Sequence, residues 1–411
     1  MVRRSLGQAY QRVLWANTIS SVGDGIYVSA LPLLAVSLTR DPRLIALVSA
    51  AAFVPWLLLS LPGGVIVDRY DRAALMWRSQ VVQGLIIAIL ALLVLVHAIG
   101  ISLLIVAGFL LGAAEVIFSN AAQSVLPDLV PADKLPKANG NLQVSLTVGE
   151  TFAGPPLGSV LFAVSRALPF GLDAGTFFGS AALVSGLPKR AVSATEHAPM
   201  LAQIGEGLRY LGRHRLLRIA AILLGVIGFA SQMGQATLVL LAVQTLHTGT
   251  RGYGLLWTAS AVGAILGGMT NPVLTRKLGM MPSLIIALLA SAVVFVGLGL
   301  APDFLVAGAC FALNGYFVTM WNVVTVSLRQ QIVPGDLLGR VNSAYRMIGW
   351  GLMPVGALAG GFVANEWGYR APYTLGGIVI AIVAVLATPT LVSIARSSRL
   401  ERVDRAIDPV G

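Results

Sequence analysis

The chain has 411 residues, of which 56% are apolar or aromatic and only 11% are charged, against about 25% charged residues in a typical soluble domain. So few charged groups cannot cover the surface of soluble domains of this total length, and disorder is excluded because it requires low hydrophobicity and dense charge. A membrane protein with several spans remains, and the formal net charge of +11 points either to nucleic acid or to one face of a membrane.

Twelve stretches are long and apolar enough to cross a bilayer, which takes about 20 mostly apolar residues. In chain order they cover 13–38, 44–67, 73–97, 101–125, 139–164, 168–187, 217–244, 253–274, 281–300, 303–328, 340–365 and 372–394. We therefore expect an all-α membrane protein with twelve transmembrane helices, consecutive ones antiparallel because most connections are short. The chain then divides into a six-helix half over 1–188, a cytoplasmic linker over 189–216, a second six-helix half over 217–396 and a cytoplasmic tail over 397–411.

The basic residues indicate which helix ends lie in the cytoplasm. With a cytoplasmic N-terminus, the outer loops contain only five of the 28 Lys and Arg residues, namely Arg40, Arg43, Arg166, Arg251 and Arg370. The others fall in cytoplasmic segments, as the positive-inside rule requires. We expect a multi-pass protein of the cell membrane with both termini in the cytoplasm. The basic balance is then an orientation signal rather than a nucleic-acid site.

The loop after the second span carries a recognisable pattern. Residues 63–72 read GGVIVDRYDR, which resembles the loop 2–3 signature of the major facilitator superfamily, Gly-x-x-x-Asp-Arg-x-Gly/Asp-Arg. Gly64 lets the helix end approach a neighbour closely, and Asp68 can pair with Arg72 and face a helix N-terminus. The resemblance implies a cytoplasmic gate, formed by Gly64, Asp68, Arg69, Asp71 and Arg72, that favours one access state. A solvated turn with positive-inside arginines is the alternative.

The fifth span contains the run GETFAGPPLG at 149–158. It resembles the Gly-Pro-rich motif of the antiporter branches of this superfamily, although the glycine spacing matches only in part. Two consecutive prolines remove helical hydrogen bonds and bend a helix, while glycines permit tight packing. The candidates for an antiporter-like bend are Gly149, Gly154, Pro155, Pro156 and Gly158. A helix in which Gly and Pro are purely structural is the alternative.

The linker predicts an amphipathic helix, because Ile204, Leu208, Leu211 and Leu216 lie among arginines at helical spacing. Such a helix can lie at the membrane surface, and a solvated linker helix is the alternative.

An internal repeat relates the two halves at a constant offset of 203 residues. Residues 129–139 read LVPADKLPKAN and residues 332–342 read IVPGDLLGRVN, so that Pro131 matches Pro334 and Asp133 matches Asp336. A parallel repeat of two six-helix halves around a midplane site is typical of transporters that rock between two access states.

A narrower resemblance covers the chain from about residue 10 to residue 395. It rests on SVGDG at 21–25, LPDLVP at 126–131, EGLRYL at 206–211 and GRVNS at 339–343. These runs are similar to the bacterial branch that includes the enterobactin exporter and the macrolide and Tap-type drug efflux proteins. The resemblance implies efflux of a drug or a siderophore-like compound, driven by proton exchange.

Carboxyl groups inside the spans are the candidates for proton or cation contacts, because an ionised group in the bilayer costs about 2.5–3.5 kcal/mol. Asp24, Glu115 and Glu150 lie in the first, fourth and fifth spans, while Asp173 and Arg346 lie nearer the ends of theirs. An internal hydrogen-bonded carboxyl that only fixes packing is the alternative. The fourth span lacks the arginine of the best-known drug antiporters, so that proton coupling is an expectation from resemblance alone.

Polar and aromatic side chains in the spans that line the central cavity of this fold are candidates for substrate contacts. They are Tyr27, Asn120, Gln232, Gln235, Asn314, Trp321 and Asn322. Each can instead form an interhelical hydrogen bond, but as a set they favour an amphipathic, fairly apolar ligand. The sequence shows no phosphate-binding loop, nucleophile elbow or paired histidine spacing, so we expect no ATP, cofactor or metal and no enzyme activity.

Taken together, we expect a monomeric secondary transporter that exports a small amphipathic compound by alternating access, with proton antiport. A proton-coupled uptake carrier is the nearest alternative. A non-transporting membrane receptor is a more distant alternative. We would expect a receptor to carry a large soluble appendage, and the sequence shows none.

Overall fold

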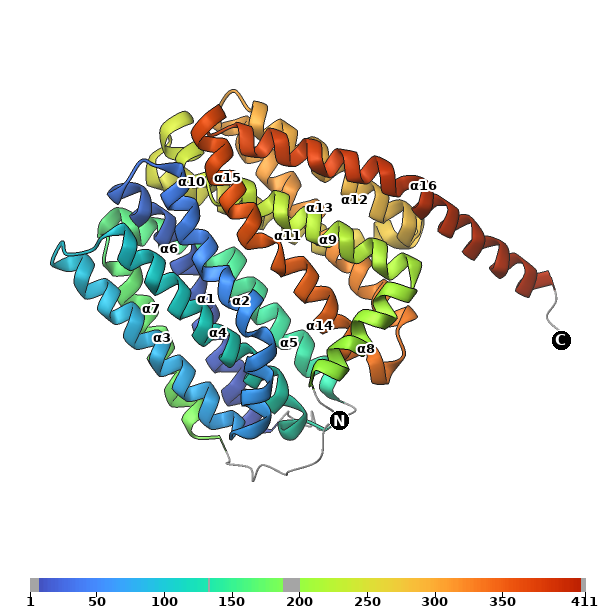
Figure 1. The fold of residues 1–411 in the computed structure, drawn as a ribbon, viewed down its shortest axis with the longest axis horizontal. Coiled ribbons are helices and arrows are strands. Elements are labelled where there is room, and N and C mark those ends of the chain that lie inside the picture. The colour runs from blue at the N-terminus through green and yellow to red at the C-terminus, as the bar shows by residue number, and fades with distance from the viewer. Residues whose placement is uncertain (1–6, 132–133, 188–199, 408–411) are drawn as a thin grey trace. The chain divides into compact units, whose positions relative to one another are not determined.

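The computed structural model describes residues 7–131, 134–187 and 200–407, and the regular structure of this part is helical without β-strands (Figure 1). The segments that cover the first six predicted spans are α1 (Gln8–Leu38), α2 (Pro42–Arg69), α3 (Arg72–Leu95), α4 (Ile101–Leu129), α5 (Leu135–Leu146), η2 (Thr147–Ala153), α6 (Gly154–Val164) and α7 (Leu168–Ser185). The linker contains α8 (Met200–Arg213). The segments that follow are α9 (Arg215–Gln235), α10 (Leu238–Leu240), η3 (Leu241–Thr245), α11 (Gly249–Leu278), α12 (Met280–Leu300), α13 (Phe304–Ile332), α14 (Gly335–Gly351), α15 (Met353–Trp367) and α16 (Ala371–Ile407).

The helices bury their polar side and expose their apolar side, the reverse of a soluble protein. On α3 the side chains of Gln80 and Gln83 are buried, whereas Leu85, Ile89 and Leu92 are more than half exposed. Such a surface is stable only where the surrounding solvent is apolar, as in the hydrocarbon core of a bilayer. The expected all-α membrane fold is therefore confirmed.

Ten helical stretches of the described residues are long and apolar enough to cross a membrane. The two predicted spans that are not among them are the fifth and the sixth. The fifth is divided into α5, η2 and α6, and α7 carries Asp173 and three glycines, which lower its mean hydropathy. Both are helical at the predicted positions, so that the count of twelve spans stays a prediction for these two.

Aspartates begin three of the long helices. Asp41 accepts a hydrogen bond from the backbone N–H of Arg43, and Asp71 accepts one from Ala74, at the starts of α2 and α3. Asp303 caps α13 in the same way. A capping carboxylate satisfies backbone donors that no preceding turn can reach, which explains why these charged residues stand at the span ends.

Contacts divide the described chain into two compact units that do not follow the two predicted halves. The first unit comprises Met1–Leu201, Gln235–Thr258 and Ala357–Tyr369, and the second comprises Ala202–Gly234, Ala259–Gly356 and Arg370–Gly411. In the first unit, α1 packs against α6 and α7, α2 against α4, and α3 against α4 and α7 (Figure 1). In the second unit, α12 packs against α13 and α16. The predicted division into six-helix halves is based on the sequence repeat and not on these contact units, so it stays a prediction.

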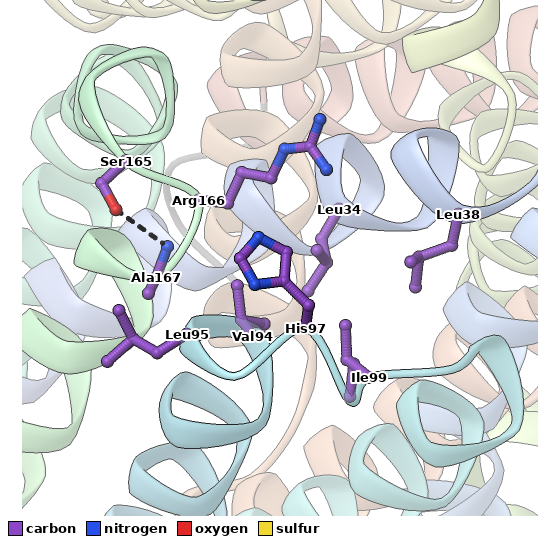
Figure 2. Close-up of a pocket in the computed structure, with 9 residues that line it drawn as sticks. All are labelled: Leu34, Leu38, Val94, Leu95, His97, Ile99, Ser165, Arg166 and Ala167. Carbon is purple, nitrogen blue, oxygen red and sulfur yellow. Dashed lines mark hydrogen bonds between the residues drawn. The ribbon is translucent and has the colours of Figure 1, made fainter.

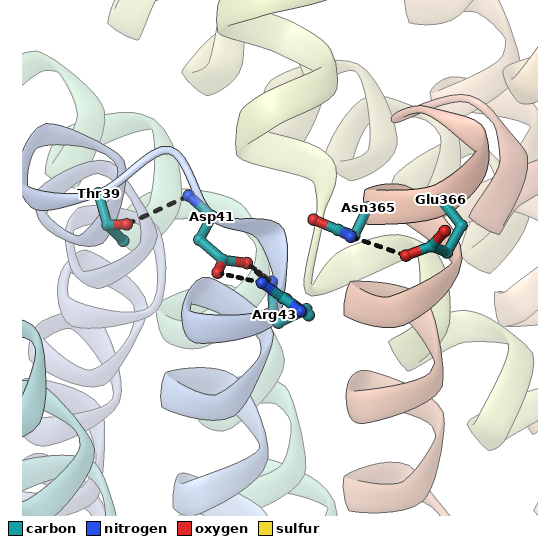
Figure 3. Close-up of polar contacts among 5 residues, drawn as sticks. All are labelled: Thr39, Asp41, Arg43, Asn365 and Glu366. Carbon is teal, nitrogen blue, oxygen red and sulfur yellow. Dashed lines mark hydrogen bonds and ion pairs between the residues drawn. The ribbon is translucent and has the colours of Figure 1, made fainter.

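Parts of α2 and α15 lie together in the first unit. Ala46 and Ala357 belong to one buried cluster of alanines, and Gly361 faces the side chain of Ala46. Close to this contact, the carboxylate of Asp41 is hydrogen-bonded to the guanidinium of Arg43 (Figure 3). The side-chain hydrogen bond from Arg43 holds the pKa of Asp41 below its ordinary value.

The linker helix α8 packs against protein in the second unit. Leu211 is buried among residues of α9, α13 and α14, and the hydroxyl of Tyr210 donates to the carbonyl of Ile332 at 3.2 Å. Glu206 forms an ion pair with Arg340 of α14. The apolar stripe of the predicted amphipathic helix therefore faces α13 and α14 rather than being left for the bilayer.

A few residues named in the sequence analysis lie outside the described part. They include the linker before α8 (188–199), Asp133 of the repeat and the side chains of Asp68, Ile204, Asp336 and Arg346. The tail begins as a continuation of α16, which runs as a helix to Ile407.

Candidate functional site

The predicted bend of the fifth span is a π-helical segment, η2, that directly precedes the two prolines. Neither Pro155 nor Pro156 has a backbone N–H, so the carbonyl groups of Thr151 and Phe152 lose the partners that an α-helix would supply. The chain widens to the π-helical form over Thr147–Ala153 and returns to an α-helix at Gly154. Single π-helical turns inside helices are frequent at functional sites.

The glycines around η2 bring it close to α1. A Cβ atom on Gly25 would lie 2.6 Å from the carbonyl oxygen of Gly149 and 2.8 Å from the Cα atom of Gly154. Gly158 faces Ser29 one turn further along α1 in the same way. A side chain at any of these positions would force the helices apart. The glycines of the predicted motif therefore serve the contact between α1 and the fifth span.

Four carboxyl-bearing residues gather where α1, α4, η2 and α7 meet in the first unit. The three charges that act most strongly on Asp24 of α1 are, in order, those of Glu115, Asp173 and Glu150. Asp173 is fully buried, whereas Glu150 is exposed. The structure thus brings together the three carboxylates that the sequence analysis selected and adds Asp173, which was placed nearer the end of its span.

A glutamine of α3 contacts Glu115. The side-chain amide of Gln83 donates to Oε2 of Glu115 at 3.0 Å, while its own Oε1 is buried without a hydrogen-bond partner among the described residues. Gln80, one turn earlier, is fully buried and both of its polar atoms lack partners there. The candidate residues predicted from the sequence do not include these two amides, although two glutamines one turn apart in an apolar span are a readable signal.

Tyr27 of α1 packs against α7 near Asp173. The ring of Tyr27 packs edge to face on Phe170, with 6.4 Å between the ring centres, and its hydroxyl lies in the electrostatic field of Asp173 and Asp24. The hydroxyl of Tyr27 and Oδ2 of Asp173 are both buried without hydrogen-bond partners among the described residues. The predicted cavity residue Tyr27 therefore belongs to the carboxylate cluster.

The other predicted substrate contacts fall in both units. Asn120 and Gln235 belong to the first unit, in α4 and α9, and the second unit holds Gln232, Asn314, Trp321 and Asn322. Each of four side chains has a buried polar atom that lacks a partner in the described part of the chain, and these are Asn120, Gln235, Asn314 and Trp321. Unpaired buried polar atoms are costly, so these four side chains stay candidates for ligand contacts within their own units.

The predicted gate residues lie at the turn between α2 and α3. Arg69 is exposed and Asp71 caps α3, while the packing of Gly64 and the side chain of Asp68 lie outside the described part. Arg72 donates to the carboxylate of Asp128 at 2.9 Å and to the carbonyl of Ser124 at 2.8 Å, both at the end of α4. The pairing of Asp68 with Arg72 stays a prediction, and Asp128 is a partner that the sequence analysis did not name.

A pocket of about 240 Å³ lies at helix ends in the first unit rather than at the carboxylate cluster (Figure 2). It is lined by Leu34 and Leu38 of α1, by His97 after α3 and by Arg166 before α7, together with their neighbours. The predicted site residues do not line it. We therefore take the carboxylate cluster, and not this pocket, as the candidate site.

Known proteins with similar sequences include several exporters. The chain is 26% identical to the uncharacterized MFS-type transporter YfiS of Bacillus subtilis, over 91% of each chain. It is 26% identical to the enterobactin exporter EntS of Citrobacter koseri, over 82% of this chain and 80% of that protein. It is 22% identical to the multidrug efflux pump Tap of Mycolicibacterium fortuitum, over 91% and 94%. Macrolide efflux protein A of Streptococcus pyogenes also matches, so the predicted resemblance to this branch is confirmed.

Solved transporter structures share the fold. The nucleoside transporter NupG superposes with a TM-score of 0.73 at 10% identity, over 93% of this chain and 98% of that one. A bacterial homologue of the iron transporter ferroportin, in its inward-facing state, superposes with a TM-score of 0.69 at 17% identity, over 95% and 99%. A family model for transmembrane secretion effectors matches residues 5–407. The chain therefore belongs to the transmembrane secretion effector family of the major facilitator superfamily, and it is a membrane transporter.

Proposed function

We propose that this transporter exports a small amphipathic compound from the cytoplasm in exchange for protons, by alternating access. Its relatives include proteins named as exporters of enterobactin and of drugs, which supports export of a drug or a siderophore-like compound. The coupling to protons is argued from the carboxylate cluster.

The observation that carries this proposal is the cluster of Asp24, Glu115, Glu150 and Asp173. Four ionised carboxylates close together in an apolar bundle repel one another, and the fully buried Asp173 also loses its hydration. The cluster can be neutralised by protons or by a cationic ligand, but the two compete for the same charges. A site that holds either protons or a cation, and not both, supplies the exchange that antiport requires.

The contact between α1 and η2 supports a moving element at this site. The π-helical turn leaves backbone groups short of regular partners, and the glycines allow α1 and the fifth span to slide past each other. Glu150 lies within η2 itself. A shift of this segment would therefore change the distance between Glu150 and the carboxyl of Asp24 on α1.

The test uses everted membrane vesicles with an acidified interior and ethidium as a cationic, amphipathic probe. We expect ethidium to accumulate inside vesicles that contain the wild-type protein and to leave when the pH gradient is collapsed. Asp24→Asn should abolish this, whereas Glu366→Gln, a carboxylate outside the cluster, should not. Erythromycin and a catecholate siderophore extend the same assay to other ligand chemistry.

Sidedness separates export from uptake. In right-side-out vesicles, an inward proton gradient should drive ethidium outward if the protein is an antiporter. Accumulation of the probe together with protons in the same vesicles would identify an uptake carrier instead. If all three probes are transported at rates that do not depend on the pH gradient, the proton-coupling part of the proposal is wrong.

A further inference from the structure

We propose that Asp173 is the proton-binding residue of this transporter, assisted by Tyr27, and that Glu115 with Gln83 binds the cationic nitrogen group of the substrate. This assignment rests on the proposed exchange of substrate for protons. It divides the carboxylate cluster into two sites of different chemistry.

The surroundings of Asp173 suit a neutral carboxylic acid. The residue is fully buried, and its Oδ2 has no partner among the described residues. Its Oδ1 lies 3.3 Å from the hydroxyl of Thr176, which is closer, at 2.8 Å, to the carbonyl of Asp173. An ionised carboxylate with so few hydrogen bonds would cost free energy in an apolar interior, whereas a proton on Oδ2 removes the charge.

Two residues of α1 complete this site. Gly23 has no side chain, and a Cβ atom there would collide with the side chains of Asp173 and Thr176. A glycine at this position therefore makes room for the carboxyl group of Asp173. Tyr27, one turn along α1, has a buried hydroxyl without a partner. The ring of Tyr27 contacts Phe170 on α7, three residues before Asp173, and in this structure its hydroxyl makes no hydrogen bond to Asp173. The phenol can donate a hydrogen bond when Asp173 is ionised and accept one when it is protonated.

Among the described residues, no positively charged side chain pairs with Asp173. Of the helices that pack against α7, α1 brings Asp24 and Tyr27 near Asp173, while its Arg12 donates to the carbonyl of Gly186 at the C-terminal end of α7, and α6 contains no titratable side chain. The arginines of α3, Arg72 and Arg78, lie in its first two turns, before the buried glutamines. Asp173 can therefore lose its proton only when the surroundings tolerate the negative charge of the carboxylate, or when a cation replaces the proton in the cluster.

Glu115 has the opposite character. It is only partly buried, its Oε2 accepts from Gln83, and the free Oε1 of Gln83 is a second acceptor beside it. Two acceptors side by side suit a ligand group with N–H donors and a positive charge. When that group binds, it supplies the charge that allows Asp173 to release its proton to water. One proton leaves for one positive charge bound, so the charge of the site is conserved.

The test uses the purified full-length protein in liposomes with ethidium as the probe. Counterflow of ethidium at equal pH on both sides measures binding and conformational exchange alone, and ethidium movement under a pH gradient adds the proton step. For Asp173→Asn we expect counterflow within about twofold of wild type and a loss of roughly tenfold or more in gradient-driven transport. For Glu115→Gln we expect both to fall.

Proton release provides a second readout. Ethidium added to wild-type protein in weakly buffered detergent should release protons, as a pH-sensitive dye reports, and Asp173→Asn should release none. Asp173→Glu, which retains a titratable group, should restore gradient-driven transport with a shifted pH profile, and Tyr27→Phe should shift the profile without abolishing counterflow.

Two outcomes would overturn the assignment. Unimpaired gradient-driven transport by Asp173→Asn would show that this residue carries no proton, and loss of counterflow in both Asp173→Asn and Asp173→Glu would show a purely structural role. A wild-type protein that exchanges ethidium without any response to the pH gradient would instead refute the proposed antiport, a result that the wild-type arm distinguishes by itself.

Discussion

The two sequence repeats share some of their packing glycines but not the acids of the cluster. At the offset of 203 residues, Gly25 matches Gly228 and Gly112 matches Gly315. Each of these four would place a Cβ atom against backbone of a neighbouring helix. The four clustered carboxylates of the first repeat, in contrast, match apolar residues or glycine in the second, namely Ile227, Val318, Met353 and Gly376.

The difference separates what the fold requires from what the transporter does. Both repeats need close helix packing, because small residues are the main device for helix association in lipid. The second repeat forms its helices without carboxylates at the matching positions, so a helix of this repeat does not need an acid there in order to form. Among the described residues of the second repeat, the partly buried Arg329 donates to Oδ1 of Asn342 at 2.9 Å, and its guanidinium lies over the ring of Tyr345.

The largest expected effect is steric. Gly25→Leu places a side chain against the backbone of Gly149 and Gly154, and overpacking of this kind costs about 1–3 kcal/mol or more. We expect a clear loss of thermal stability in detergent and of folded protein in the membrane. Gly175→Leu is the matched control, because a Cβ atom there meets no other group. Equal stability of the two variants would contradict the role of Gly25 in packing.

The second prediction concerns the acids. Asp24→Asn removes one of four mutually repelling carboxyl groups, so the protein should be as stable as wild type or more so. Transport driven by a pH gradient should fall roughly tenfold or more, the equivalent of about 1.4 kcal/mol. Thermal unfolding and vesicle transport measure the two parts. The converse variant, Ile227→Asp, should lower membrane insertion by about 2.5–3.5 kcal/mol without any gain in transport. A gain of transport activity in Ile227→Asp would contradict the difference between the acids of the first repeat and the matching positions of the second.

The third prediction concerns the ion pair between Arg72 and Asp128. Both side chains are partly exposed, at 34% and 21%, so that the pair contributes only about 0–1 kcal/mol to stability. Asp128→Asn should therefore leave unfolding nearly unchanged but slow transport, since the pair joins α3 to the end of α4. Transport rates at saturating probe and unfolding temperatures test this. A large loss of stability would mean that the contact is structural.

The smallest effect is expected at Asp41. The side-chain hydrogen bond from Arg43 lowers the pKa of Asp41 in the folded protein, so its contribution is complete above the unfolded pKa and is lost as the pH falls through the folded pKa. The exposure of the pair limits the contribution to less than about 1 kcal/mol, and Asn is also a good N-cap. At pH 7 the Asp41→Asn variant should be as stable as the wild type. Below about pH 4 the wild type should lose slightly more stability than the variant, because only the wild type has a carboxylate to protonate at this position. Unfolding temperatures measured from pH 7 to pH 3 check this.

Much of the site could be predicted from the sequence. Asp24, Glu115 and Glu150 are acids within apolar spans, and the cost of their burial marks them without any structure. Asp173 was underrated because its distance from the span end is a poor measure of burial. The role of Gln83 depends on α3 lying beside α4, and the pair of Arg72 with Asp128 joins residues 56 positions apart. No local pattern contains such contacts.

The sequence by itself determined the membrane class, the helical stretches and the family pattern, since each follows from local hydrophobicity and spacing along one helix. It also determined which acids stand in apolar surroundings. Only the tertiary structure decided that four acids from four helical segments meet, that Gly23 makes room for Asp173, and that the prolines of the fifth span produce a π-helical turn against α1. These features depend on how the helices are turned toward one another, which is set by the packing of many distant residues at once.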